Sequence, residues 1–202
     1  LDDVLLIDDF AFRTASPFID APAGVDFTVG IAPANSSSSA DAIATFDYNL
    51  TANETYIIVA SGIVNAAGYN PAPAFNLEVF AGAREVSSTN GNTDVLVYHG
   101  STDAPAVDVV ETLVTGGATI VDNAFYSDFA GYLELATLDY RLAVKDATGS
   151  VTVKTYEAPL ETLGLQNLAL TVLASGFLDP SQNSNGAPFG LFVALPSGGA
   201  LI

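Results

Sequence analysis

An internal repeat is the feature of the sequence that most constrains its fold. When the sequence is shifted by about 114 residues, apolar positions fall on apolar positions in the same order over most of a domain length. Residues 7–9 then match residues 121–123, and the segment 59–62 (V-A-S-G) matches 173–176 (L-A-S-G). Self-similarity of this kind is the signature of one structural unit used twice. The sequence therefore predicts two copies of one domain, a first copy over residues 1–90 and a second copy over residues 91–202, with a polar linker or long turn at residues 87–93.

Within each copy the residue pattern is that of β-strands. In residues 139–145 (D-Y-R-L-A-V-K) large apolar side chains occupy every second position, which is the period of a half-buried strand. Denser β-branched and apolar runs at residues 55–60 and 168–174 predict central strands that are buried on both faces. Short strands separated by turn-forming residues predict an all-β protein made of two tandem antiparallel immunoglobulin-like β-sandwich domains.

The two copies are unequal at their beginnings. The second copy opens with an expected strand at residues 95–99, a turn at 100–105 and another strand at 106–110. The first copy has no counterpart of these segments, because its first residues already align with the region that follows them. We therefore expect the first sandwich to lack its opening hairpin, which would leave unpaired backbone groups and an uncovered apolar face.

Three sources could fill this gap. Residues upstream in the same polypeptide could supply the hairpin, or the first copy could be a smaller variant that uses Asp2 to Ile7 as its edge. A strand from another chain could also insert by β-strand addition, and such head-to-tail association need not close and can grow into a fibre.

Composition excludes several functional classes. With 23 acidic residues against 5 basic ones, the net charge is -18, the wrong sign for binding nucleic acid or anionic lipid. There is no Cys and only one His, which excludes disulfides, thiolate metal sites, cysteine nucleophiles and imidazole-rich metal sites. The longest nearly apolar stretch, residues 168–178, is far shorter than the ~20 residues of a membrane-spanning helix, so we expect no direct membrane insertion.

The residues between the second copy's first two strands suggest turn chemistry. Ser101 and Asp103 can accept backbone N–H bonds within the turn, Pro105 fixes the backbone where the chain reverses, and Asp108 stands between two core-facing valines. We expect His99 to be a neutral imidazole hydrogen-bonded in or beside the sheet. Side chains two positions apart on one strand cannot form a Ser-His-Asp triad, so we predict no catalytic site.

We also expect no organic cofactor, and calcium is the ion that fits this acidity best. The chain has no D-x-[DN]-x-[DN]-G loop, and the calcium candidates are therefore weak. They are Asp2, Asp3, Asp8, Asp9, Asp103 and Asp108.

Residues 95–110, V-L-V-Y-H-G-S-T-D-A-P-A-V-D-V-V, resemble the signature of the domain of unknown function 4397 family, approximately V-R-V-V-H-A-S-P-D-A-P-x-V-D-V-Y. Gly100 replaces the usual Ala, Thr102 the Pro and Val110 an aromatic residue. The resemblance runs from Val95 to about Gly176, and a weaker resemblance runs from Leu5 to Gly62. It implies a secreted or cell-surface immunoglobulin-like sandwich, often in tandem in bacterial and archaeal proteins, with no enzymatic activity and no established ligand.

These observations predict a non-catalytic extracellular structural or adhesive surface protein. Its most specific form is a fibre subunit that self-associates head to tail by β-strand addition at the first copy. The alternative is an extracellular module that binds a surface glycan or a calcium ion through the loops at one end of a sandwich.

The excess of acidic charge gives a first prediction. Carboxylates repel one another in the folded chain, and salt screens that repulsion. The melting temperature, measured by differential scanning calorimetry, should therefore rise between low salt and seawater-like salt. An unchanged melting temperature would mean that the carboxylates are spread too far apart to affect stability.

Overall fold

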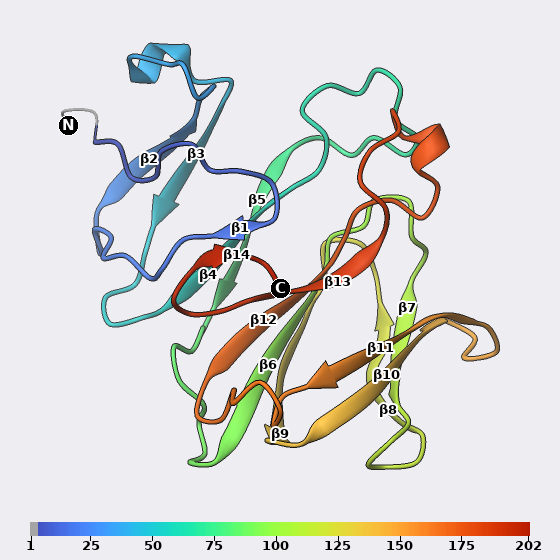
Figure 1. Ribbon diagram of the computed structural model, residues 1–202. Helices are drawn as coiled ribbons and strands as arrows, with labels where there is room; N and C mark the ends of the chain where they lie inside the picture. The colour runs from blue at the N-terminus through green and yellow to red at the C-terminus, as the bar shows by residue number, and fades with distance from the viewer. Residues whose placement is uncertain (1–3) are drawn as a thin grey trace.

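The computed structural model describes residues 4–202 and confirms the all-β class (Figure 1). Two short 3-10 helices, Ser39–Asp41 and Pro180–Gln182, interrupt the strands. The strands are β1 (Thr14–Ala15), β2 (Asp26–Ile31), β3 (Ala44–Asn49), β4 (Tyr56–Ser61), β5 (Asn76–Ala81), β6 (Asn92–His99), β7 (Val107–Glu111), β8 (Ala118–Ala124), β9 (Phe129–Ala136), β10 (Asp139–Asp146), β11 (Thr152–Pro159), β12 (Ala169–Ser175), β13 (Gly190–Ala194) and β14 (Gly199–Ala200). No helix in this part of the chain is long and apolar enough to cross a membrane.

The second copy is a closed sandwich of two four-stranded sheets, with strand orders β11-β10-β7-β8 and β13-β12-β6-β9. Its core lies between the sheets and contains Val107, Val144, Tyr140 and Leu170. Neighbouring strands are antiparallel, as expected, except that β6 runs parallel to β12. The parallel pair was not expected from the sequence, because alternation of apolar residues does not encode the direction of pairing.

The first copy forms two separate hairpins, β2–β3 and β4–β5. The β2–β3 hairpin projects at the upper left of Figure 1, away from the two four-stranded sheets. The segment 168–174 lies in a central strand, as expected, with β13 on one side of β12 and β6 on the other. The prediction that 55–60 is also a central strand is wrong, because within residues 4–202 β4 pairs with β5 alone.

The backbone nevertheless repeats at the same shift as the sequence. Strands β4 and β5 pair Tyr56 with Ala81 through Ser61 with Asn76, and β12 pairs with β13 at equivalent positions, Ser175 opposite Gly190. Left-handed backbone conformations, which few residues adopt, also recur in pairs. Their φ angles are 48° and 49° at Asp9 and Asn123, 60° and 69° at Arg13 and Ser127, 61° and 66° at Asn53 and Asn167, and 84° and 92° at Gly62 and Gly176.

At Gly62 and Gly176, steric contacts explain why both copies have glycine at the same position. A Cβ atom on Gly62 would lie 2.3 Å from the Ala74 carbonyl oxygen, and one on Gly176 would lie 2.3 Å from that of Pro188. Both positions therefore need glycine for its conformation and for the close backbone approach.

The β4–β5 hairpin packs on the outer face of the sheet β13-β12-β6-β9. The Phe80 ring lies 5.3 Å from that of Phe129 and 5.8 Å from that of Tyr132, measured between centroids. Leu96 and Tyr98 alternate with the inward-facing residues of β6, so their side chains point outward, and yet both are fully buried. The first copy therefore covers an apolar face of the second.

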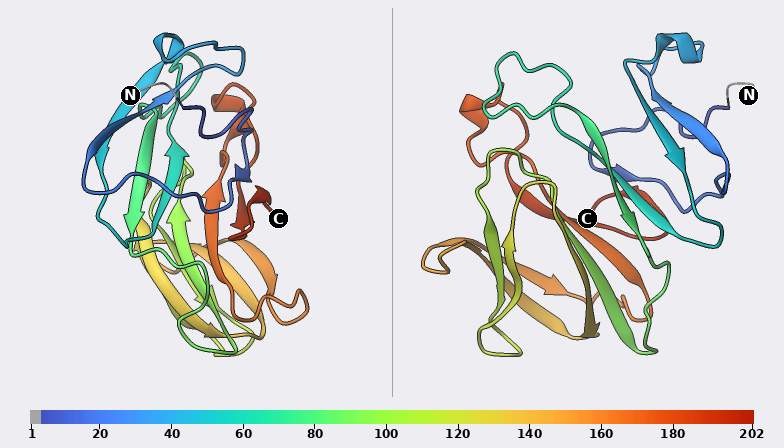
Figure 2. Two further views of the ribbon diagram at one scale, coloured as in Figure 1. Left: turned by 90° about the vertical axis from the view of Figure 1, so that its left-hand side faces the viewer. Right: turned by 180° about the vertical axis from the view of Figure 1, so that it is seen from behind.

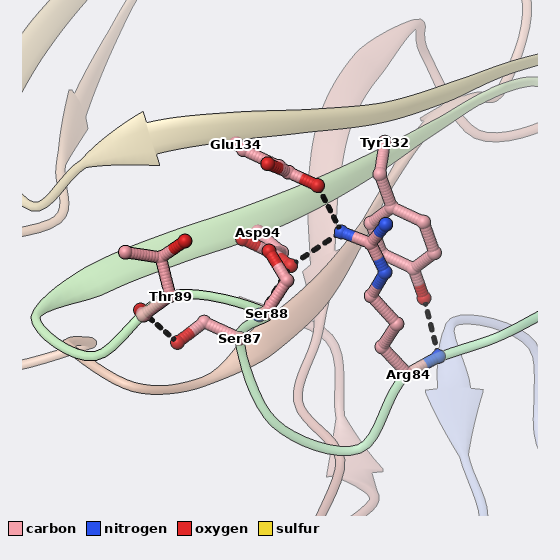
Figure 3. A network of polar contacts seen from close by, with 7 residues as sticks. All are labelled: Arg84, Ser87, Ser88, Thr89, Asp94, Tyr132 and Glu134. Carbon is pink, nitrogen blue, oxygen red and sulfur yellow. Dashed lines mark hydrogen bonds and ion pairs between the residues drawn. The ribbon is translucent and has the colours of Figure 1, made fainter.

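The segment between the copies is fixed rather than a free linker (Figure 3). The guanidinium of Arg84 lies between two carboxylates, with Nη1 2.6 Å from Oδ2 of Asp94 and 2.8 Å from Oε1 of Glu134. The backbone N–H of Arg84 donates to the Tyr132 hydroxyl (2.8 Å), and that of Ser88 donates to Asp94 Oδ2 (2.8 Å). Asp94 is fully buried, so its charge is acceptable only because these donors compensate it.

The repeat supplies a matched pair of substitutions. Val193 packs against the second copy's core, whereas its counterpart Val79 is 38% exposed. Val193→Ala should lower the free energy of unfolding by about 1–2 kcal/mol, and Val79→Ala by less than about 0.5 kcal/mol. Urea denaturation of the monomeric protein measures both values. Equal losses of unfolding free energy would show that Val79 is as well packed as Val193.

Candidate functional site: the open sheet of the first copy

The candidate site is the side of the first copy that corresponds to the core of the second. Among residues 4–202, every buried apolar side chain lies at residue 95 or later. On β4, Ile58 is 43% exposed and Ala60 is exposed, whereas Ala174, the counterpart of Ala60 on β12, is only 5% exposed. The first copy therefore has apolar residues at the positions that form the core of the second copy, but these side chains are not buried.

Comparison of the two copies identifies the strands that would close this face. In the second copy, β6 occupies the edge of β12 opposite β13, and β7 occupies the edge of β10 opposite β11. The corresponding edges of β4 and β2 carry no strand in the part of the chain that the structure describes. Residues 4–202 contain no counterpart of the β6–β7 hairpin for the first copy, as expected from the sequence. The unpaired N–H and C=O groups of such edges are a template for another strand.

Figure 2 shows from two further sides how the first copy (blue to cyan) lies against the second (green to red). An apolar hollow lies between the copies at the end of β4. A cavity of about 120 Å³ is lined by residues 59–63 at the end of β4 and by Tyr98 and residues 173–177 of the second copy. A neighbouring hollow of about 410 Å³ shares Phe12, Ile63 and Phe177 with it. This surface can take apolar side chains and backbone hydrogen bonds, and its lining residues include no Asp, Glu, His, Lys or Arg.

A second exposed apolar surface lies at the beginning of the described chain. The side chains of Val4, Leu5, Leu6 and Ile7 are between 41% and 75% exposed, and the segment belongs to no strand. Its counterpart in the second copy is β8, which pairs with β7. Four consecutive exposed apolar residues are unusual on a soluble surface and indicate an interaction site.

His99, in contrast, is buried inside the second copy. Burial lowers its pKa, and its Nε2 lies 3.2 Å from the carbonyl oxygen of Pro105. A carbonyl can only accept, so Nε2 carries a proton in this hydrogen bond, and the lowered pKa favours the neutral form of the ring. His99 therefore fixes the start of the turn rather than offering a base to solvent.

Ser101 and Asp103 hold the turn to a different loop, which corrects the expectation that they cap the turn itself. The Ser101 hydroxyl donates to the Gly176 carbonyl oxygen (2.6 Å). The carboxylate of Asp103 accepts from the backbone N–H of Leu178 (2.9 Å) and from Asn183 Nδ2 (3.0 Å). These partners are distant in sequence, so spacing within the motif could not reveal them.

The structure forms no calcium site from the four candidates that it describes. Asp2 and Asp3 lie outside the described residues, and Asp8 and Asp9 are exposed. Asp108 is buried and accepts the backbone N–H of Asn123 (2.8 Å). Among residues 4–202, no group of three or more acidic or histidine side chains could hold a metal ion.

Sequence reasoning missed the two arginines that attach the first copy to the second. Arg13 donates to the carbonyl oxygens of Ser175 (3.1 Å) and Pro188 (2.9 Å), and Arg84 forms the ion pairs described above. The one signal in the sequence was the small number of basic residues. With only 5 in 202, each one is a candidate for a specific ion pair or hydrogen bond.

With this geometry established, comparison with known proteins adds a family. Residues 1–110, more than half of the chain, match the family model described as Domain of unknown function (DUF4397), and the chain belongs to that family. The match includes the motif at 95–110, but it covers the first copy together with β6 and β7 rather than running on to Gly176. No curated protein and no solved structure matches the chain.

The carboxylate of Glu111, which the sequence analysis also missed, gives a testable pH dependence. Burial acts to raise its pKa, but N–H bonds from Thr115, Val114 and Leu113 and the Thr115 hydroxyl outweigh burial and lower the pKa to about 2. Because the folded pKa lies below the unfolded value of ~4.3, this stabilisation is present above that pH and is lost as the pH falls toward about 2.

Glu111→Gln should therefore lower the free energy of unfolding at neutral pH by about 1–3 kcal/mol. The difference from the wild type should shrink as the pH falls through the range from ~4 to ~2, because the wild-type carboxylate becomes protonated there. Urea denaturation at several pH values measures this difference. A difference that stays constant down to the lowest pH would contradict the assignment.

Proposed function

We propose that this protein is a non-catalytic extracellular structural subunit whose first copy is completed by a strand from a second molecule of the same protein. The observation that carries this proposal is the open core face of β4, where Ile58 and Ala60 are exposed although their counterparts in β12 lie in a closed sandwich. One added strand would both pair the free edge of β4 and cover part of this face.

The energetics support an added strand. Full burial of an Ile or Val side chain contributes about 1.5–3 kcal/mol, and the open face presents Ile58, Val79 and the half-buried Leu77. Pairing also satisfies backbone groups along the β4 edge. Because Ile58 and Val79 are only 43% and 38% exposed, the acceptor face supplies less than half of these amounts. Burial of the donor's own apolar side chains must therefore contribute a large share of the ~4–15 kcal/mol cost of bringing two molecules together.

One-way donation of a strand is a contact of the kind that can build an open polymer. The acceptor lies on the first copy, and a donor strand must come from a different surface of the neighbouring molecule. An interface between two different surfaces is heterologous, and such contacts build a filament when the rotation between subunits does not close.

The charge fits assembly in a salt-containing extracellular medium. At a net charge of -18, neighbouring molecules repel one another at low ionic strength. A non-catalytic role is supported by His99, Ser101 and Asp103, whose polar atoms form bonds within the fold.

The test compares the wild type with one variant of the open face and one matched control. Ile58→Asp places a charge on the open face, and Val153→Asp places the same charge at a similarly exposed position (40%) on β11 of the second copy. Both positions are exposed, so both variants should remain folded. Light scattering and negative-stain electron microscopy at seawater-like salt report the assembly state.

We expect regular linear particles for the wild type and for Val153→Asp, and monomers for Ile58→Asp. A wild type that stays monomeric at all concentrations and salt levels would overturn the proposal. Unimpaired assembly of Ile58→Asp would overturn it equally, because the charge would then lie outside the contact.

A further inference from the structure

The beginning of the chain resembles the strand that is missing from the first copy. Residues 3–7 read D-V-L-L-I, and residues 94–98, within β6, read D-V-L-V-Y. The first three residues are identical, and the last two are apolar in both segments. This similarity has a different register from the internal repeat, in which residues 4–10 correspond to β8.

The segment is also available for pairing. Val4, Leu5, Leu6 and Ile7 are all exposed and belong to no sheet, whereas the corresponding residues of β6 are buried or packed against the core. An apolar segment without a strand partner and a sheet edge without a strand therefore occur in one molecule.

Building on the proposed function, we propose that Val4–Ile7 of one molecule is the donor strand and pairs in parallel with β4 of the next molecule. The register follows from the second copy, where β6 places Val95 opposite Leu170 and Val97 opposite Val172. Transferred to the first copy, Val4 lies opposite Tyr56 and Leu6 opposite Ile58.

In this register the donor strand presents apolar side chains on both faces, one toward the open core of the first copy and one toward the second copy. Val4 and Leu6 take the places of Val95 and Val97, which face the sandwich core, and cover the exposed side of Ile58. Leu5 and Ile7 take the places of Leu96 and Tyr98, which are fully buried against the other copy. A donor that is apolar on both faces suits a strand that lies between two layers.

The donor comes from another molecule because its own chain directs it to the other sheet. Asp9 and Arg13 repeat the left-handed conformations of Asn123 and Ser127, which follow β8 in the second copy. Strand β8 belongs to the sheet of β10, the counterpart of β2, and not to the sheet of β12. Residues 9–13 therefore lead Val4–Ile7 toward the side of β2, away from the β4 edge of the same molecule.

Cysteine cross-linking tests the donor and its register, because the chain contains no natural Cys. The double variant Leu6→Cys/Ile58→Cys places thiols on directly opposed residues of neighbouring strands, where a disulfide is sterically possible. The control Leu6→Cys/Val153→Cys keeps the donor thiol and moves the acceptor thiol to β11. After mild oxidation of assembled protein, non-reducing gels and intact mass spectrometry identify the products.

We expect a ladder of disulfide-linked multimers from Leu6→Cys/Ile58→Cys, linked dimers from a mixture of the two single variants, and no ladder from the control. A disulfide within one chain would overturn the proposal, because the segment would then close on its own copy. Assembled particles without the disulfide would assign the donor to another segment and leave the proposed function standing. Monomers without any disulfide would overturn both.

Discussion

The pairing of β6 between β12 and β9 is the constraint on which the rest of this fold depends. Strand β6 joins the β12–β13 pair to β9 in one sheet, and its side chains pack on both faces of that sheet. Val97 packs into the sandwich core, while Leu96 and Tyr98 lie beneath the first copy. Without such a strand, a sheet of this order is reduced to a two-stranded hairpin with one edge that has no hydrogen-bonding partner. Among residues 4–202, the first copy shows this result, with β4 paired to β5 and the other edge of β4 open.

The first copy therefore depends on the second for its order. Its β4–β5 hairpin packs through Phe80 on the rings of Phe129 and Tyr132, and Arg13 and Arg84 bind groups of the second copy. These contacts cover only one face of the hairpin. They fix its position without closing its core, so the hairpin is held as an edge that can receive a further strand without first having to fold.

The sequence predicted the strands, the repeat and the missing hairpin, because each leaves a local trace. Alternation marks strands such as 139–145, and the V-A-S-G and L-A-S-G segments mark the repeat. The parallel direction of β6 and β12, the edge position of 55–60 and the bonds of Asp103 were not predictable in this way. Each depends on which distant segment lies alongside, and alternation of apolar residues carries no information about that partner.

The residues that match the family model extend past the first copy. Residues 1–110 contain the first copy followed by β6 and β7, so the matched unit holds a counterpart of each segment of a complete sandwich, with the hairpin last. In the structure that hairpin closes the copy that follows it. The second copy is thus completed by strands that precede the rest of it in sequence. A donor strand from a neighbouring molecule would extend this pattern from copies within one chain to molecules within a filament.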